Sequence, residues 1–196
     1  MANIITLTRL LLVLIIGAIA FYAPPIMQLL NVVFVIIAFI LDAIDGIIAR
    51  KRHEVTLFGA IFDIAADRIV EISLWIILAQ VSIVSPWIAI IFVMRGILVD
   101  SLRKQQSNQG KAPFNIMKTK IGIFLVSSRA MRLWYGFFKL ITFSWLFLQI
   151  PLPIIWPEVW IIFSNLFTFI SYSLISVTVA LCLIRGIPVL LEAICC

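Results

Sequence analysis

Six apolar stretches divide this chain, and each is long enough to cross a bilayer, which requires about 20 helical residues. Of its 196 residues, 64% are hydrophobic and 12% are charged, whereas an ordinary soluble domain carries about 25% charged residues. A soluble chain of this length cannot bury so much apolar surface, so a soluble enzyme, a secreted disulfide scaffold and a disordered chain are excluded. We therefore predict an all-α, polytopic integral membrane protein with six transmembrane helices, at residues 4–22, 28–50, 57–81, 86–106, 115–148 and 157–190.

The connections between these stretches predict the domain organisation and the orientation. They contain proline, glycine and polar residues but no repeat or long linker, so residues 1–196 are expected to form a single domain. The connections after the second and fourth spans are rich in Lys and Arg, whereas those at 23–27, 82–86 and 149–156 carry no charge. Because membrane proteins keep basic loops in the cytoplasm, both termini are predicted to be cytoplasmic. The net charge of +6 therefore indicates membrane topology and not a nucleic-acid-binding surface.

Four carboxylates lie inside predicted spans, where a charged residue at the helix centre costs about 2.5–3.5 kcal/mol. Asp42 and Asp45 lie near the end of the second span, and Asp63 and Asp67 lie about two turns into the third. A spacing of three or four residues places each pair on one face of its helix. The short connection between the two spans brings both pairs to a similar depth.

Carboxylates in one cavity repel each other strongly unless they are protonated or neutralised by cations. Oxygen ligands suit hard divalent ions, so the sequence predicts Mg²⁺ or Mn²⁺, with a charge count that fits two ions. The alternative is salt bridging between helices, for example of Asp67 or Glu71 with Arg68.

The spacing of these carboxylates belongs to a longer pattern. The segment reads Asp42-Ala-Ile-Asp45-Gly46-Ile-Ile-Ala49-Arg50, then eight residues, Gly59, three residues, Asp63, three residues and Asp67. It resembles, at every fixed position, the signature of the CDP-alcohol phosphatidyltransferase family, D-x2-D-G-x2-A-R-x8-G-x3-D-x3-D. A pattern with this many fixed positions is far more specific than a lone glycine motif. The six-span hydropathy resembles that family over nearly the whole chain.

This resemblance implies a reaction in which an alcohol attacks the β-phosphate of CDP-diacylglycerol and CMP leaves. It implies that Asp42, Asp45, Asp63 and Asp67 bind the metals, and that Asp67 is also the general base for the acceptor hydroxyl. It suggests a homodimer as well. We expect the active site to open to the cytoplasm, where CMP and a polar acceptor dissolve.

Small and polar residues of the motif are expected to bind the CDP-linked lipid. Glycine and alanine allow close approach of a ligand, although tight helix packing is an equally good reason for them. Arg50 can hydrogen-bond a phosphate through its planar guanidinium. Residues 3, 6 and 9 resemble the N-x2-T-x2-R pattern that begins many family members, but Arg9 also suits a topology determinant that faces the headgroups. The predicted lipid-binding residues are Asn3, Thr6, Asp45, Gly46, Ala49, Arg50 and Gly59.

The acceptor has to be inferred from other charges. Arg95 lies in the middle of the fourth span, Arg103 follows eight residues later, and Lys118 begins the fifth span. A basic cluster near a metal site favours a phosphorylated acceptor, because a neutral alcohol does not need it. These three residues resemble those with which phosphatidylglycerophosphate synthases, a branch of the family, receive glycerol 3-phosphate. We predict that they bind the acceptor phosphate, with inositol phosphate or serine as alternative acceptors.

Two questions stay open at this level. A second polar stripe consists of Ser128, Arg132, Tyr135 and Lys139. It completes an anion pocket, pairs with Asp100 or Glu71, or extends its charges to the membrane interface. In another functional class, a divalent-cation transporter also carries carboxylates inside its spans. The motif glycines and the adjacent Arg50 argue against a transporter, because an ion pathway has no use for a phosphate-binding guanidinium.

Overall fold

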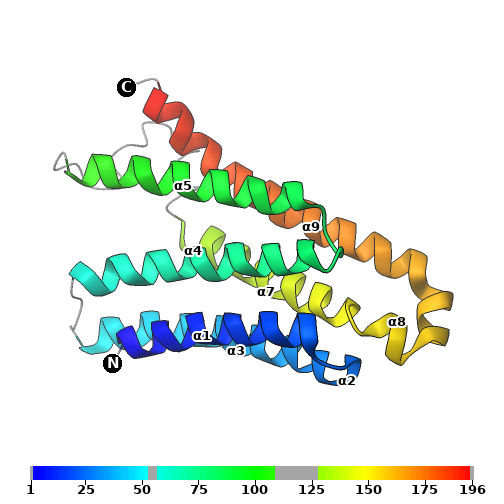
Figure 1. The fold of residues 1–196 in the computed structure, drawn as a ribbon. Helices are drawn as coiled ribbons and strands as arrows, with labels where there is room; N and C mark the ends of the chain where they lie inside the picture. The colour runs from blue at the N-terminus through cyan, green and yellow to red at the C-terminus, as the bar shows by residue number, and fades with distance from the viewer. Residues whose placement is uncertain (1, 53–56, 109–127, 195–196) are drawn as a thin grey trace. The chain divides into compact units, whose positions relative to one another are not determined.

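The structure is a computed structural model that describes residues 2–52, 57–108 and 128–194 (Figure 1). Within these ranges the regular elements are all helical, which confirms the all-α prediction. The helices are α1 (Ala2–Tyr22), α2 (Pro25–Gln28), α3 (Leu30–Arg52), α4 (Leu57–Gln80), α5 (Pro86–Asn108), α7 (Arg129–Gln149), α8 (Leu152–Ile155) and α9 (Pro157–Ile194).

Among the described residues, four helical segments are long and apolar enough to cross a membrane: Ile4–Tyr22, Pro25–Ile44, Leu133–Ile155 and Pro157–Leu191. This agrees with a membrane protein, whereas the number of six spans stays a prediction. α4 and α5 have 24 and 23 residues, which is sufficient length, but both carry several charged residues. α9 has 38 residues, so a membrane-spanning α9 must tilt or extend beyond the bilayer, as predicted from its length.

Two details differ from the predicted boundaries. The short helices α2 and α8 lie in segments predicted to be plain connections, and each begins beside prolines, which favour the first turn of a helix. The predicted fifth span starts at residue 115, outside the described residues. Ser128, which was expected to continue the helical polar stripe, instead precedes α7, a position that serine favours.

The chain forms two compact units. Unit 1 comprises Met1–Ala89 and Phe143–Phe169, and unit 2 comprises Ile90–Thr142 and Ile170–Cys196. α5, α7 and α9 each contribute a part to both units. The single domain predicted for residues 1–196 stays a prediction.

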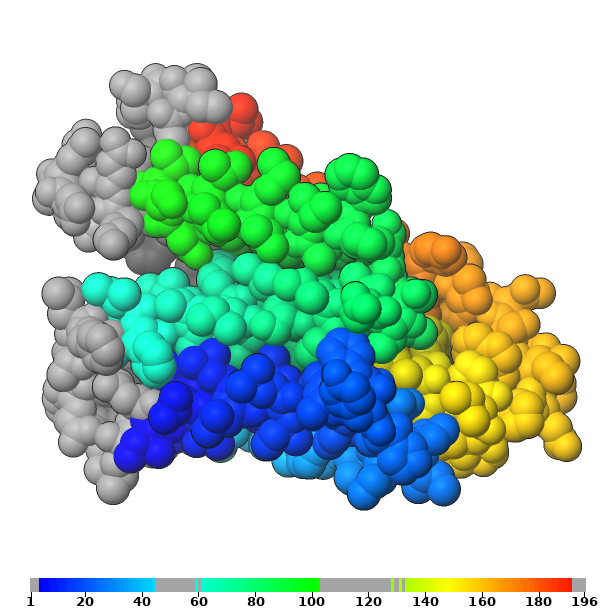
Figure 2. Space-filling view, in the orientation of Figure 1, coloured from blue at the N-terminus to red at the C-terminus, as the bar shows by residue number. Residues whose placement is uncertain are grey.

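In unit 1, α1 packs against both α3 and α4, and Figure 2 shows α1 lying along α4. The buried residues of α1 recur at spacings of three and four, which is one face of a helix. They are Thr6, Arg9, Val13, Ile16 and Ala20. Leu7, Leu11 and Leu14 of the same helix are exposed, as expected for a surface that contacts lipid.

An aromatic cluster fixes the middle of unit 1. Phe143 of α7 lies between Trp75 of α4 and Phe39 of α3, with ring centroids 4.8 Å and 6.0 Å apart. Phe143 and Trp75 are both fully buried. Because an aromatic ring buries a large apolar area with a defined geometry, this cluster holds α3, α4 and α7 together.

In unit 2, the first part of α7 and the second part of α9 are joined by a pair of hydroxyl groups. Thr142 Oγ1 and Thr178 Oγ1 lie 2.8 Å apart, and both side chains are fully buried. Val99 of α5 packs with Val189 of α9. Unit 2 therefore brings α5, α7 and α9 together through both polar and apolar contacts.

Phe143→Ala is expected to destabilise the protein by about 3–5 kcal/mol, because it leaves a cavity among three helices. The measurement is unfolding of the purified protein in detergent micelles, followed by tryptophan fluorescence. Phe137→Ala is the matched control on the same helix, since Phe137 is 52% exposed, and it should change stability little. Equal destabilisation by the two variants would contradict this account of the core.

Candidate active site

Arg9 of α1 lies among three of the four motif carboxylates. Its Nη1 is 2.6 Å from Asp42 Oδ1 of α3 and 3.6 Å from Asp63 Oδ1 of α4. Its Nη2 is 3.7 Å from Asp67 Oδ1. One guanidinium group therefore gathers carboxylates from two other helices.

The fold brings these residues together because each of them continues the packed face of its helix. Asp42 follows the buried residues Asn31, Val35 and Ala38 at spacings of three and four. The start of α1, the end of α3 and the start of α4 lie at the same end of unit 1 (Figure 1). The carboxylates therefore meet at one depth, as the motif spacing predicted.

The site is negatively charged. Arg9 is 2% exposed, whereas the side chains of Asp42, Asp63 and Asp67 are 41%, 49% and 38% exposed. The group has one guanidinium and three carboxylates, which gives it a net charge of −2. Asp45 is not included in this count, because its side chain lies outside the described part of the structure. A buried guanidinium requires such partners, and the remaining negative charge attracts further cations.

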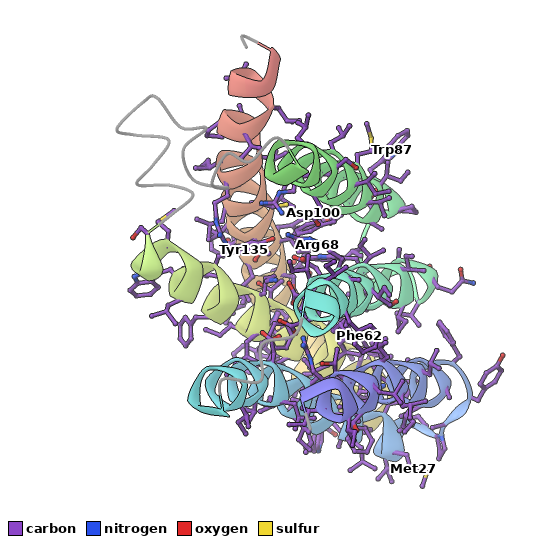
Figure 3. The ribbon with its side chains drawn as sticks, turned by 90° about the vertical axis from the view of Figure 1, so that its left-hand side faces the viewer. Met27, Phe62, Arg68, Trp87, Asp100 and Tyr135 are labelled. Atoms are coloured by element: carbon purple, nitrogen blue, oxygen red, sulfur yellow. The ribbon has the colours of Figure 1, made fainter. Side chains whose placement is uncertain are left out.

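The alternative interpretation as helix-to-helix salt bridges is correct in part. Arg68, labelled in Figure 3, pairs with Glu71 of its own helix, with Nη1 3.0 Å from Oε2. The ion pairs that link helices are made by Arg9 instead. They neutralise only part of the carboxylate charge, so they leave a role for metal ions.

The carboxylates fit a divalent ion in their chemistry. They offer hard oxygen ligands, and Arg9 shows that this point of unit 1 stabilises positive charge. Within the described side chains no group of three acidic, histidine or cysteine residues has the geometry of a formed metal site. The side chain of the predicted fourth ligand, Asp45, lies outside the described side chains.

The other predicted residues are only partly described. Thr6 is buried on the same face of α1 as Arg9, and Gly59 lies in α4. Arg95 is buried in α5. Lys118 lies outside the described residues. The remaining ones belong to α1, α3 or α5, but their side chains are outside the described part of the structure: Asn3, Asp45, Gly46, Ala49, Arg50 and Arg103.

The structure describes the surroundings of three cations that the sequence analysis left open or did not name. Arg9 was left open between a family pattern and a topology determinant, although it continues the stripe of Thr6, Val13 and Ile16 that identifies the packed face of α1. Arg185 was not considered, although a cation inside an apolar span is itself a signal. Lys139 was left open between a pocket and the membrane interface, and it is 6% exposed.

These features define a class of protein. Residues 1–156 match the family model described as CDP-alcohol phosphatidyltransferase, so the chain belongs to this family. The match includes α1, α3 and α4, and therefore the carboxylates and Arg9.

The chain is similar to several curated relatives. It is 33% identical over 97 residues, 50% of each chain, to the CDP-diacylglycerol–glycerol-3-phosphate 3-phosphatidyltransferase of Bacillus subtilis (strain 168). It is 36% identical over 84 residues, 41% of this chain and 46% of the relative, to the enzyme of that name from Wigglesworthia glossinidia brevipalpis. The CDP-diacylglycerol–inositol 3-phosphatidyltransferase 1 of Arabidopsis thaliana is 34% identical over 79 residues, 40% of this chain and 33% of the relative. The chain thus spans half or less of the length of these relatives.

Arg9→Gln removes the described cation at the centre of the carboxylates. In the presence of a chelator we expect the variant to be less stable than the unchanged protein by about 1–3 kcal/mol, a value reduced because the carboxylates are partly exposed. Mg²⁺ or Mn²⁺ should then raise the melting temperature more in the variant, because the ion supplies the missing positive charge. Differential scanning fluorimetry with and without the ions measures this.

Arg68→Gln is the control for the Arg9 variant. Arg68 pairs with Glu71 of its own helix, and none of the ion pairs described above joins it to Asp42, Asp63 or Asp67. Its melting temperature should respond to metal as that of the unchanged protein does. An identical metal response in all three proteins would contradict the assignment of Arg9 to the cation-binding group.

Proposed function

We propose that this protein transfers the phosphatidyl group of CDP-diacylglycerol to glycerol 3-phosphate, giving phosphatidylglycerophosphate and CMP. The observation that carries the proposal is the convergence of Asp42, Asp63 and Asp67 on one point of unit 1, in a chain that belongs to the family. Relatives from two bacteria whose names include this reaction support the choice of acceptor.

The carboxylates and the small residues of the motif are proposed to bind the donor. Mg²⁺ or Mn²⁺, in our proposal two ions held by Asp42, Asp45, Asp63 and Asp67, would neutralise negative charge on the diphosphate. The further donor-binding residues in this proposal allow close approach or donate hydrogen bonds: Asn3, Thr6, Gly46, Ala49, Arg50 and Gly59.

Asp67 is proposed as the general base. Its carboxylate accepts the proton of the acceptor hydroxyl, and the hydroxyl oxygen forms a bond to the β-phosphorus of the donor. The bond between this phosphorus and the bridging oxygen breaks, and CMP leaves with that oxygen. Asp67 is 38% exposed, so a substrate hydroxyl can reach it, and Arg9 limits the directions in which the carboxylate points.

Buried positive charge favours a phosphorylated acceptor over a neutral one. Arg95 is 7% exposed in α5, and its Nε has no hydrogen-bond partner among the described atoms, so an anion would reduce the cost of burying this charge. We propose that Arg95, Arg103 and Lys118 bind the phosphate of glycerol 3-phosphate. The Arabidopsis relative, whose name gives inositol as acceptor, makes a neutral alcohol the alternative to test.

The membrane supplies the donor lipid in this proposal. The apolar helices place the protein in a membrane. We propose further that both termini and the active site face the cytoplasm, where the polar acceptor and CMP dissolve, and that two copies form a homodimer.

The test of this function is CMP release by the purified protein, with CDP-diacylglycerol in mixed micelles and a panel of acceptors. We expect release with glycerol 3-phosphate, complete loss with a chelator, and recovery with Mg²⁺ or Mn²⁺. Release with serine or inositol but not with glycerol 3-phosphate would replace the acceptor. Ion flux into liposomes without CMP release would identify a transporter instead.

Asp67→Asn keeps the shape of the side chain but removes the base. We expect kcat to fall by about 100-fold or more, because general-base catalysis contributes roughly 10²–10⁴-fold. Asp67→Asn and Asp42→Asn each remove a proposed metal ligand, so both should weaken binding of CDP-diacylglycerol, whereas kcat at saturating donor should fall further in Asp67→Asn because only this variant also lacks the base. Turnover of Asp67→Asn at a near-normal rate would show that another group is the base.

A further inference from the structure

Two cationic side chains of unit 2 lie against the ring of Tyr135 of α7, and a third, that of Arg95, lies against the residue that follows one of them in α9. Lys139 Nζ lies 4.6 Å from the centroid of the Tyr135 ring, and Arg185 Cζ of α9 lies 5.0 Å from it. Both distances are within the range of about 6 Å in which a cation is attracted to an aromatic ring. Tyr135, which Figure 3 labels, therefore holds one cation from its own helix and one from α9.

Arg95 of α5 joins the group through Gly186, the residue after Arg185. A methyl group at Gly186 would lie 2.9 Å from Arg95 Cγ and 3.1 Å from Arg95 Nε. The Arg95 side chain thus rests directly on the backbone of α9. A residue with a Cβ at position 186 would force Arg95 to shift, because Arg95 Cγ is not at the flexible far end of its side chain.

Two of these cations, Arg95 and Lys139, are buried together with the Tyr135 side chain, whereas Arg185 is partly exposed. Arg95, Lys139 and Tyr135 are 7%, 6% and 4% exposed. A cation that extends to the interface leaves its charged end in contact with water or headgroups, which burial of this degree does not permit.

Positive charge exceeds negative charge among the described side chains of unit 2. These side chains include three cations, Arg95, Lys139 and Arg185, and one carboxylate, that of Asp100, so their net charge is +2. In addition, Arg95 Nε is buried and has no hydrogen-bond partner among the described atoms. A buried N–H without an acceptor costs about 1–3 kcal/mol, more when it is charged, so this group is suited to an anion that supplies oxygen acceptors.

We infer that Tyr135 and Gly186 are positioning residues that hold Arg95, Lys139 and Arg185 as one receptor for the phosphate of the acceptor alcohol. The inference rests on the proposed function and extends it, because it adds two cations and two supporting residues to Arg95. A ring that orients two cations reduces the side-chain entropy lost when a phosphate monoester binds between charged groups.

The first test compares two glycine variants. Gly186→Ala pushes Arg95 from its place, whereas Gly136→Ala is the matched control, because a methyl group at Gly136 meets no atom within 4 Å. Both lie within helices and gain the same helix propensity. We expect Gly186→Ala to raise the KM for glycerol 3-phosphate roughly 10-fold with little change in the KM for CDP-diacylglycerol. Gly136→Ala should leave both values unchanged.

The second test separates the ring of Tyr135 from its hydroxyl group. Tyr135→Leu removes the aromatic ring and should raise the KM for glycerol 3-phosphate about 5- to 30-fold, the range that two cation–π contacts represent. Tyr135→Phe retains the ring and should rescue most of that loss. Inorganic phosphate, used as a competitive inhibitor, should bind more weakly to Tyr135→Leu by a similar factor.

The outcomes distinguish the inference from the function on which it rests. If the unchanged protein releases CMP only with a neutral acceptor, the proposed function and the inference both fail. If it uses glycerol 3-phosphate but Gly186→Ala and Tyr135→Leu keep its normal KM, only the inference fails. A loss of melting temperature with equal weakening of both substrates would assign these residues a structural role and would likewise overturn it.

Discussion

Burial of charge in a medium that solvates it poorly is the constraint on which unit 1 depends. Arg9 is almost fully buried, so its helix must lie where Asp42, Asp63 and Asp67 can reach it. The apolar contacts of α1 with its neighbours define a packed face, but apolar faces tolerate sliding along the helix axis better than ion pairs do. The ion pairs therefore set the register of α1 against α3 and α4, and this register places three motif carboxylates at one depth.

The described charged groups of the two units differ in sign, which agrees with the proposed transfer between two anionic substrates. The group around Arg9 in unit 1 has three carboxylates and one guanidinium, whereas the described side chains of unit 2 include three cations and one carboxylate. A diphosphate donor that depends on hard cations needs the first kind of site, and a phosphorylated acceptor needs the second.

The fold class and the position of the carboxylates followed from local sequence rules. Apolar length predicted the helices, and a spacing of three or four residues predicted that Asp63 and Asp67 share a face. The contacts of Arg9 with the carboxylates and of Arg185 with Tyr135 were not predicted, because these partners lie on other helices, distant in sequence, and a spacing rule within one helix gives no information on such contacts. The predicted fifth span is tested only from Ser128 onward, where α7 begins after this residue, because its first part lies outside the described residues.

The division of the chain explains why a donor motif predicts the family better than it predicts the acceptor. The family model covers residues 1–156 and so includes the carboxylates, but Arg185 and Gly186 lie beyond its end. Relatives whose names give glycerol 3-phosphate and inositol as acceptors both align with this chain over part of its length. Both of the named reactions need a group that binds the common donor, whereas only the reaction with glycerol 3-phosphate needs a receptor for a charged acceptor. In our proposal, selection among acceptors depends on residues such as those that surround Tyr135, where positive charge makes a neutral alcohol the poorer electrostatic match.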